Sequence, residues 1–258
     1  MQNKLIKPII QLGTSAGVIL PRKWLNGTAS IELIEEPINP SVDIIKILEK
    51  NLYDIKGVYL TGSYARNEQD KDSDIDILVI TNGIKGKIKK GRYEIIMLPE
   101  KNIKSILDKT IFPLLPMIKE SVAILNKELI SPYRNHKINK GALKNNLKLI
   151  SSAIAINKED IKLVKELKQD KLGDGTSYSL VLRLRELYIL NCLKKDKLWS
   201  KKEFIYLIKK IAGTTQVYDG YINIKKGFAS KKRLSIEEAE KLIFYIEKEL
   251  KKWEETRS

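Results

Sequence analysis

The chain has 258 residues, 43% of them apolar, which is enough for one large domain or for two or three small domains with their own cores. Its formal charge of +16 favours polyanions as partners, although heat-adapted proteins are often basic without such a partner. One cysteine excludes an intrachain disulfide, and one histidine excludes a histidine-rich metal site within the chain. Any metal chemistry must therefore use carboxylates.

The N-terminal residues 4–35 contain short apolar runs that are interrupted by Gly13, Gly17, Pro21 and Gly27. This pattern is typical of strands and turns, so we expect a small β unit. The interrupted run is a poor signal peptide, and no segment has the roughly 18 uninterrupted apolar residues of a membrane span. We therefore expect a cytoplasmic protein.

The central part of the chain alternates between strand and helix patterns. Strands are predicted at 57–62, 74–80 and 92–98, with a glycine-containing turn at 83–91. One helix is predicted to start at the N-cap Ser41, and another to cover 101–109. One more strand and one more helix are predicted within 117–135. Short connections between these elements predict a mixed rather than a fully parallel sheet.

From Lys140 onward the pattern changes to long helices, predicted at 142–169, 178–195, 201–213 and 235–255. Ser235 and Glu238 form a capping box at the start of the last one. The predicted fold class is mixed α+β, with three parts: a β unit over 1–38, a central α/β domain over 41–137 and a helical bundle over 140–258.

Two aspartates, Asp74 and Asp76, flank Ile75 at the head of an apolar strand. Residues two apart on a strand point to the same face, about 6 to 7 Å apart along the chain, while Ile75 turns into the core. Two like charges on one face repel each other unless a cation compensates them, and hard oxygen ligands suit Mg²⁺ or Mn²⁺. Pairs of this kind also occur in exposed turns, so the pair alone decides little.

Neighbouring residues supply the other parts of an active site. Glu94 lies on the next predicted strand, so three carboxylates on adjacent strands are available for two metal ions. Upstream, a strand runs into a turn where Gly62 lets an anion approach the backbone and Ser63 offers its hydroxyl. Arg66 and Lys71 offer positive charge to a triphosphate. This conjunction favours an active site over a solvated surface.

The stretch GSYARNEQDKDSDIDILVI resembles nucleotidyltransferases of the DNA polymerase β superfamily, whose signature is a Gly-Ser turn, a polar spacer and Asp-x-Asp. It is especially similar to the minimal nucleotidyltransferases, in which Arg follows the Gly-Ser pair. The resemblance covers residues 41–135. Asn67 departs from the pattern, because many minimal members have Gly after the Arg.

This resemblance implies a role for each matched residue. Asp74 and Asp76 would bind two Mg²⁺ ions, Glu94 would complete the site and help to activate the acceptor hydroxyl, and Gly62 and Ser63 would hold the β- and γ-phosphates of an NTP. The implied reaction is in-line attack by the acceptor hydroxyl on the α-phosphate.

The segment IIQLGTSAGVILPRKWL resembles the AbrB/MazE type of swapped-hairpin domain, through Gly13, Gly17, Pro21 and the basic pair before Trp24. In that family two chains interlace, so the resemblance implies a homodimer. Many members also bind DNA through basic residues, for which the candidates here are Lys4, Lys7, Arg22 and Lys23. A pure dimerisation element is the alternative.

Two features of the helical part stay open. Arg183 and Arg185 lie in a leucine-rich helix and are either solvated or directed toward the substrate. Tyr218 and Tyr221 are spaced to share a helix face and either stack on a base or pack in the core.

The leading hypothesis is a metal-dependent nucleotidyltransferase that transfers an NMP from an NTP to a hydroxyl of a nucleic acid end, a protein or a small molecule. The alternative is a DNA-binding, antitoxin-like regulator whose nucleotidyltransferase fold senses nucleotide or is inactive. Both aspartates, the Gly-Ser turn and the third acid are present, which argues against inactivity.

Overall fold

A computed structural model describes residues 5–34, 38–71 and 73–255. The chain divides into two compact units, Met1–Asn39 and Pro40–Ser258. Among the described residues, no helix has the length and apolar character needed to cross a membrane.

The first unit is a short antiparallel hairpin of β1 (Ile10–Leu12) and β2 (Ser15–Gly17), followed by the 3-10 turn η1 (Arg22–Trp24). Gly13 makes the hairpin turn with a φ of +60°, a backbone conformation that glycine adopts readily. None of residues 5–34 is buried. The predicted β unit is therefore present, but it has no core within a single chain.

The second unit contains a five-stranded sheet with the strand order β5-β6-β4-β3-β7. Its strands are β3 (Ile55–Thr61), β4 (Ile75–Thr81), β5 (Gly86–Lys90), β6 (Tyr93–Pro99) and β7 (Val122–Leu125). The pair β4 and β6 is parallel, and the other neighbours are antiparallel. This confirms the predicted mixed sheet.

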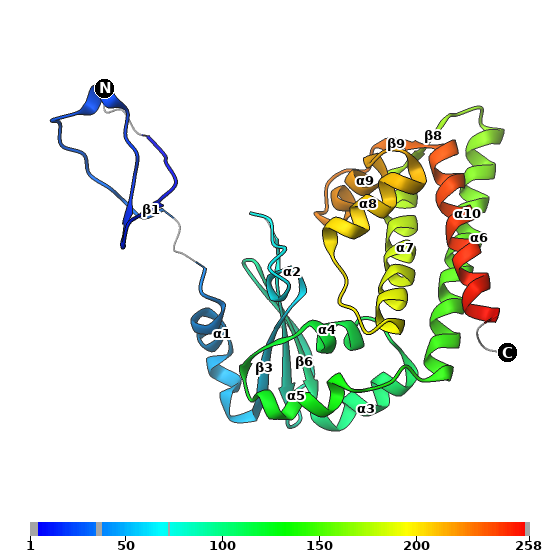
Figure 1. Cartoon of the computed structure of the whole chain (residues 1–258), viewed down its shortest axis with the longest axis horizontal. Coiled ribbons are helices and arrows are strands. Elements are labelled where there is room, and N and C mark those ends of the chain that lie inside the picture. Colours follow the sequence, from blue (N-terminus) through cyan, green and yellow to red (C-terminus); the bar gives the residue numbers. More distant parts are fainter. Residues whose placement is uncertain (1–4, 35–37, 72, 256–258) are drawn as a thin grey trace. The chain divides into compact units, whose positions relative to one another are not determined.

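The two faces of the sheet bury different cores. Ile75 and Ile77 of β4 pack with Ile44 of α1 (Pro40–Leu48) in one cluster. Leu78 and Ile80 point to the opposite face and join the larger core, which continues through the C-terminal helices. Figure 1 shows α1 on one side of the sheet and α4 on the other. The alternation of β4 therefore decides which of its side chains face the helical region.

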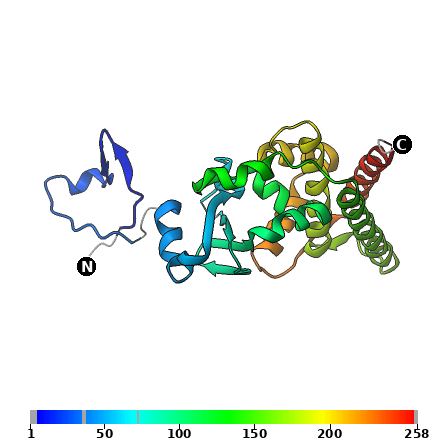
Figure 2. The same ribbon diagram turned by 90° about the horizontal axis from the view of Figure 1, so that it is seen from below.

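Short helices surround the sheet, and longer ones form the C-terminal region. They are η2 (Glu49–Asp54), α2 (Gly62–Ala65), α3 (Glu100–Lys109), α4 (Leu114–Glu120), α5 (Lys127–Arg134), α6 (Lys140–Glu166), α7 (Asp174–Lys194), α8 (Lys201–Ala212), α9 (Gln216–Lys225) and α10 (Ile236–Glu255). In Figures 1 and 2, α6 and α10 run side by side. The helical C-terminal part and the mixed fold class are confirmed.

The capping box predicted for the last helix is present. The Ser235 N–H donates to Glu238 Oε2 over 3.1 Å, and the Glu238 N–H donates to Ser235 Oγ over 3.2 Å. Two donors at the helix start are thus satisfied reciprocally. By contrast, α1 begins at Pro40, so Ser41 lies in its first turn instead of capping it.

Other elements differ from the prediction. Residues 83–91, predicted as a turn, contain β5, which becomes a strand because it pairs over its whole length with Tyr93–Met97 of β6. Helix α4 was not predicted at all. A small ladder of β8 (Lys171–Gly173) and β9 (Lys232–Ser235) also occurs in the region predicted to be helical.

Candidate active site

The three predicted acids lie at the same end of two neighbouring strands. Asp74 comes just before β4, Asp76 is the second residue of β4, and Glu94 is the second residue of β6. The parallel register pairs Asp76 directly with Glu94. Because Ile75 is fully buried on the opposite face, the sequence-based prediction that the acids share one face agrees with this register.

The carboxyl of Asp76 has a raised pKa. Burial raises the pKa of its carboxyl from the ordinary 3.8 to about 6; Lys225 opposes this shift, and the negative charges of Glu94, Asp74 and Glu120 add to it. A carboxylate that is removed from water among like charges is stabilised by a bound cation. The surroundings of Asp76 therefore favour positive charge.

Two lysines supply part of that charge. Lys225 Nζ, at the end of α9, lies 3.3 Å from Asp74 Oδ2, and Lys89 Nζ lies 2.7 Å from Glu94 Oε1. Within 5–34, 38–71 and 73–255, no three or more histidine, cysteine, aspartate or glutamate side chains are grouped as a metal site would require. Metal binding by the three acids stays a prediction.

The Gly62 turn packs directly against Asp76. Gly62 has a φ of +70°, and a Cβ placed on it would lie 2.1 Å from Asp76 Oδ2. The preceding Thr61 donates its hydroxyl to the Asp76 carbonyl over 3.1 Å. Only glycine fits here, for reasons of both backbone conformation and space. The Gly-Ser turn and the acids therefore occupy one site.

Asn67 takes the place of the more common glycine at the end of the turn. Its φ is +55°, in the left-handed region that asparagine tolerates better than most residues. The Glu68 N–H donates to the Ser63 carbonyl over 2.9 Å, which closes the turn. Asparagine is thus compatible with the tight bend at this position.

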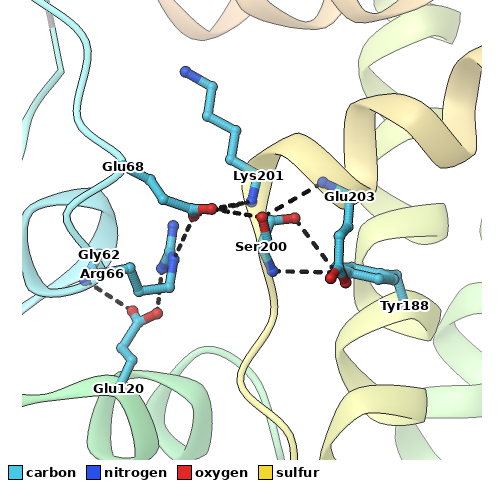
Figure 3. Close-up of polar contacts among 8 residues, drawn as sticks. All are labelled: Gly62, Arg66, Glu68, Glu120, Tyr188, Ser200, Lys201 and Glu203. Atoms are coloured by element: carbon cyan, nitrogen blue, oxygen red, sulfur yellow. Dashed lines mark hydrogen bonds and ion pairs between the residues drawn. The ribbon is translucent and has the colours of Figure 1, made fainter.

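The predicted phosphate-binding side chains lie in different surroundings. Ser63 is half-buried at the start of α2, and Lys71 is exposed in the loop before β4. The side chain of Arg66 is only 8% exposed and forms ion pairs with Glu120 and Glu68. Figure 3 shows Arg66 between these two carboxylates. Its predicted contact with a triphosphate stays a prediction.

The candidate DNA-binding residues belong to the first unit. Lys7, Arg22 and Lys23 are exposed, and Lys4 lies outside the described residues. DNA binding by these residues stays a prediction, as does the resemblance to the AbrB/MazE type of domain.

The open residues of the helical part are engaged within it. Arg183 donates to both carboxylate oxygens of Glu186, at 2.9 and 2.8 Å. Arg185 lies 3.5 Å from the hydroxyl of Tyr221, which is buried and stacks on Tyr178 with ring centroids 5.3 Å apart. In this conformation Tyr221 therefore packs in the core.

Three residues near the site were not found from the sequence. Glu120 accepts the Gly62 N–H over 2.8 Å although the two are 58 positions apart. Lys225 reaches Asp74 from α9. Glu68 lies inside the quoted motif, but nothing in the motif indicates its contact with Ser200, 132 positions later. Only the tertiary fold brings these residues together.

Comparison with known proteins identifies the central part of the chain. Residues 42–140 match the family model for the nucleotidyltransferase domain. The chain contains a nucleotidyltransferase domain. This match confirms the predicted enzyme class, a nucleotidyltransferase. The matched segment includes the three acids and the Gly62 turn.

Solved structures show distant similarity. The spectinomycin adenyltransferase AAD(9) from Enterococcus faecialis, with ATP and spectinomycin, is 12% identical with a TM-score of 0.42, covering 82% of this chain and 98% of that one. A nucleotidyltransferase-like protein from Exiguobacterium sibiricum is 12% identical with a TM-score of 0.31, covering 82% and 73%. A toxin-antitoxin structure with AMP-PNP is 15% identical with a TM-score of 0.26, covering 50% and 99%.

These TM-scores are too low for the acceptor or ligands of those proteins to be transferred to the nucleotidyltransferase domain described above. No curated protein matches the chain.

Proposed function

We propose that the protein transfers an NMP from an NTP to an acceptor hydroxyl, and that Asp74, Asp76 and Glu94 hold the divalent cation that this reaction uses. The observation that carries the proposal is the contact between the Gly62 turn and Asp76, beside Glu94 in register. A turn suited to phosphate and a group of acids suited to a cation meet at the same end of β4 and β6.

The acids at this end of the two strands fit Mg²⁺ or Mn²⁺. Asp74, Asp76 and Glu94 are oxygen donors, which these hard cations prefer. The raised pKa of Asp76, caused first by burial and then by its acidic neighbours, is what a bound cation would reverse. When bound, the cation would supply Lewis-acid stabilisation of the charge that develops on the phosphates.

The protein's own residues would do the rest by position. We propose that Glu94 accepts the proton of the acceptor hydroxyl as its oxygen bonds to the α-phosphorus and the bond to the β-phosphate breaks, which releases pyrophosphate. The Ser63 hydroxyl would donate to a phosphate oxygen. Gly62 contributes the bend, since its N–H already donates to Glu120. Lys71, exposed on the adjacent loop, is a further candidate for phosphate charge. Correct placement of the reacting atoms supplies much of the rate enhancement in such reactions.

The test is transfer of label from NTPs carrying a labelled α-phosphate. Purified protein with Mg²⁺ or Mn²⁺ is offered RNA, protein and a metabolite extract as acceptors. We expect transfer by the wild type and by the control Asp196→Asn, whose side chain is 95% exposed. Asp74→Asn and Asp76→Asn should lose about a hundredfold or more of the rate. Equal transfer by these site variants would exclude the assigned site.

For the first unit we propose a homodimer through the N-terminal hairpin. Its large aliphatic side chains lie in the open, among them Ile6, Ile19 and Leu25 at 73%, 66% and 74% exposure. None of residues 5–34 is buried, so this unit needs further apolar surface to be stable, and a second copy of the same hairpin offers it.

The DNA-binding alternative is separated by the same preparation. A protein that transfers no label to any acceptor but binds duplex DNA at physiological salt would be a regulator. Substituting Arg22 and Lys23 would then weaken binding and reduce its salt dependence.

A further inference from the structure

Arg66 lies at the centre of a chain of polar contacts that joins the Gly62 turn to the start of α8. The chain consists of Gly62, Glu120, Arg66, Glu68 and Ser200, and we refer to it as the Arg66 relay. Figure 3 shows these residues linked by dashed lines, from Gly62 through Glu120, Arg66 and Glu68 to Ser200.

At one end of the relay, Glu120 uses both of its oxygens. Oε1 accepts the Gly62 N–H over 2.8 Å, and Oε2 pairs with Arg66. The side chains of Glu120 and Arg66 are only 6% and 8% exposed. Removing one partner of such a buried pair leaves the other charge unpaired, which is costly. Each side chain therefore holds the other in position. The turn is thereby held by a group that is itself held by Arg66.

At the other end, Glu68 receives three kinds of donor. Arg66 Nε lies 3.1 Å from its Oε2, the Ser200 hydroxyl donates to Oε1 over 2.6 Å, and the Lys201 N–H donates at 3.0 and 2.9 Å to the two oxygens. Burial alone would raise the pKa of Glu68, but these hydrogen bonds together lower it. A carboxylate at the first N–H of α8 also complements the positive end of the helix.

The surroundings of Arg66 leave it little freedom. Its guanidinium lies 6.0 Å from the ring centroid of Trp199, the residue before the α8 cap. Trp199 is 4% exposed. Lys201 adds a second link between the same elements through its ion pair with Asp70. Arg66 therefore contacts both the turn side and the helix side of the site.

We infer that Arg66 is a positioning residue: through Glu120 and Glu68 it couples the orientation of the Gly62 turn to the position of the α8 N-terminus. Its relevance to NTP binding rests on the proposed function, whereas the coupling itself does not. The consequence is that loosening the α8 end of the relay loosens the turn.

Hydrogen exchange on the full chain tests the coupling without any substrate. Glu68→Ala removes the helix end of the relay. Ser200→Gly removes the hydroxyl that donates to Glu68 and also caps α8 by accepting the Glu203 N–H, at a cap position that tolerates glycine. We expect both variants to exchange faster, by about threefold or more, in the peptide that contains residues 60–66. Ser200→Thr keeps the hydroxyl and should restore wild-type exchange.

The matched control is Glu203→Gln, at the same end of α8. Glu203 accepts from Tyr188 and Lys197, and it is outside the relay. This variant should change exchange locally and leave residues 60–66 at the wild-type rate. Unchanged exchange at 60–66 in both Glu68→Ala and Ser200→Gly would overturn the coupling, as would an equal effect of Glu203→Gln.

Titration of the same proteins with ATP and Mg²⁺ tests the link to the nucleotide. We expect Glu68→Ala and Ser200→Gly to bind ATP at least about threefold more weakly than the wild type and Ser200→Thr. Faster exchange with unchanged ATP affinity would overturn the positioning role, because Glu68 would then only stabilise the fold. If the wild type bound no ATP, the proposed function would fail, and exchange at 60–66 would decide the coupling alone.

Discussion

At the scale of single residues, Gly62 allows little change. Two independent properties constrain it: its φ is positive, and a Cβ placed on it would lie 2.1 Å from Asp76 Oδ2. We expect Gly62→Ala to lose about 1 to 2 kcal/mol of unfolding free energy from backbone strain and a further ~1 to 3 kcal/mol from the overlap. Urea unfolding measures the loss, and label transfer should fall with it.

Gly91 is the matched control for this substitution. Its φ is +57°, but a Cβ there meets nothing within 4 Å. Gly91→Ala should therefore show the strain alone and keep transfer at the wild-type level. Equal losses of stability in the two variants would mean that a Cβ at position 62 does not overlap with Asp76.

The raised pKa of Asp76 predicts that the stability of the fold depends on pH in the absence of metal. The folded protein keeps the proton on this carboxyl up to about pH 6, because burial raises its pKa, whereas the unfolded chain releases it near the ordinary 3.8. The folded state therefore binds more protons between these values, and stability falls as pH rises through that window. Asp76→Asn remains neutral and escapes this loss.

We expect the advantage of Asp76→Asn over the wild type to grow between pH 4 and pH 7, by about 3 kcal/mol at most. Denaturant titrations in chelator-treated buffer measure it. Added Mg²⁺ should reduce the difference, since a ligand that binds the folded wild type stabilises it. A difference that is the same at pH 4 and pH 7 would refute the raised pKa.

The sequence predicts that Asp76 and Glu94 lie together on neighbouring strands, but it does not predict the residues around them. Asp76 and Glu94 follow from strand alternation, which fixes the face of a side chain locally. The partner of Gly62 does not, because Glu120 reaches it from a helix with no signal of its own. Arg66 shows the same limit: its charge is evident in the sequence, but its pairing depends on residues distant along the chain.

At the scale of elements, the capping box of α10 gives a direct prediction. Ser235→Ala removes the acceptor for the Glu238 N–H, and caps of this kind contribute about 1 kcal/mol. We expect a loss of that size in urea unfolding. Ser151→Ala, at an exposed position inside α6, serves as the control and should leave stability unchanged or slightly raised.

The elements found from sequence are those whose own residues specify them. The apolar runs of β3, β4 and β6 predict strands from their own residues, and the spacing of apolar residues predicts the long helices. In contrast, β5 reads GKIKK between glycines and becomes a strand only by pairing with β6. The β8–β9 ladder likewise depends on partners about sixty positions apart.

At the scale of the whole molecule, the second unit brings its helices to the acids in two ways. Lys225 of α9 contacts Asp74, and the start of α8 contacts the Gly62 turn through the Arg66 relay. The helical region thus takes part in the candidate site instead of only accompanying it.

The first unit gives a prediction for the assembly of the chain. If two hairpins cover each other's aliphatic side chains, sedimentation at micromolar concentration should show a dimer. Ile19→Asp places a charge on an exposed aliphatic position and should shift the protein toward monomer. A monomeric wild type would refute the proposed dimer, without affecting the site of the second unit.

The central claim is that the Gly62 turn and the acids form one site for nucleotide and metal. Titration calorimetry of ATP, with and without Mg²⁺, tests it most directly on the wild type and Asp76→Asn. The account predicts ATP binding by the wild type that weakens about tenfold or more when Mg²⁺ is removed or Asp76 is replaced. Equal ATP affinity of both proteins, with and without Mg²⁺, would contradict it.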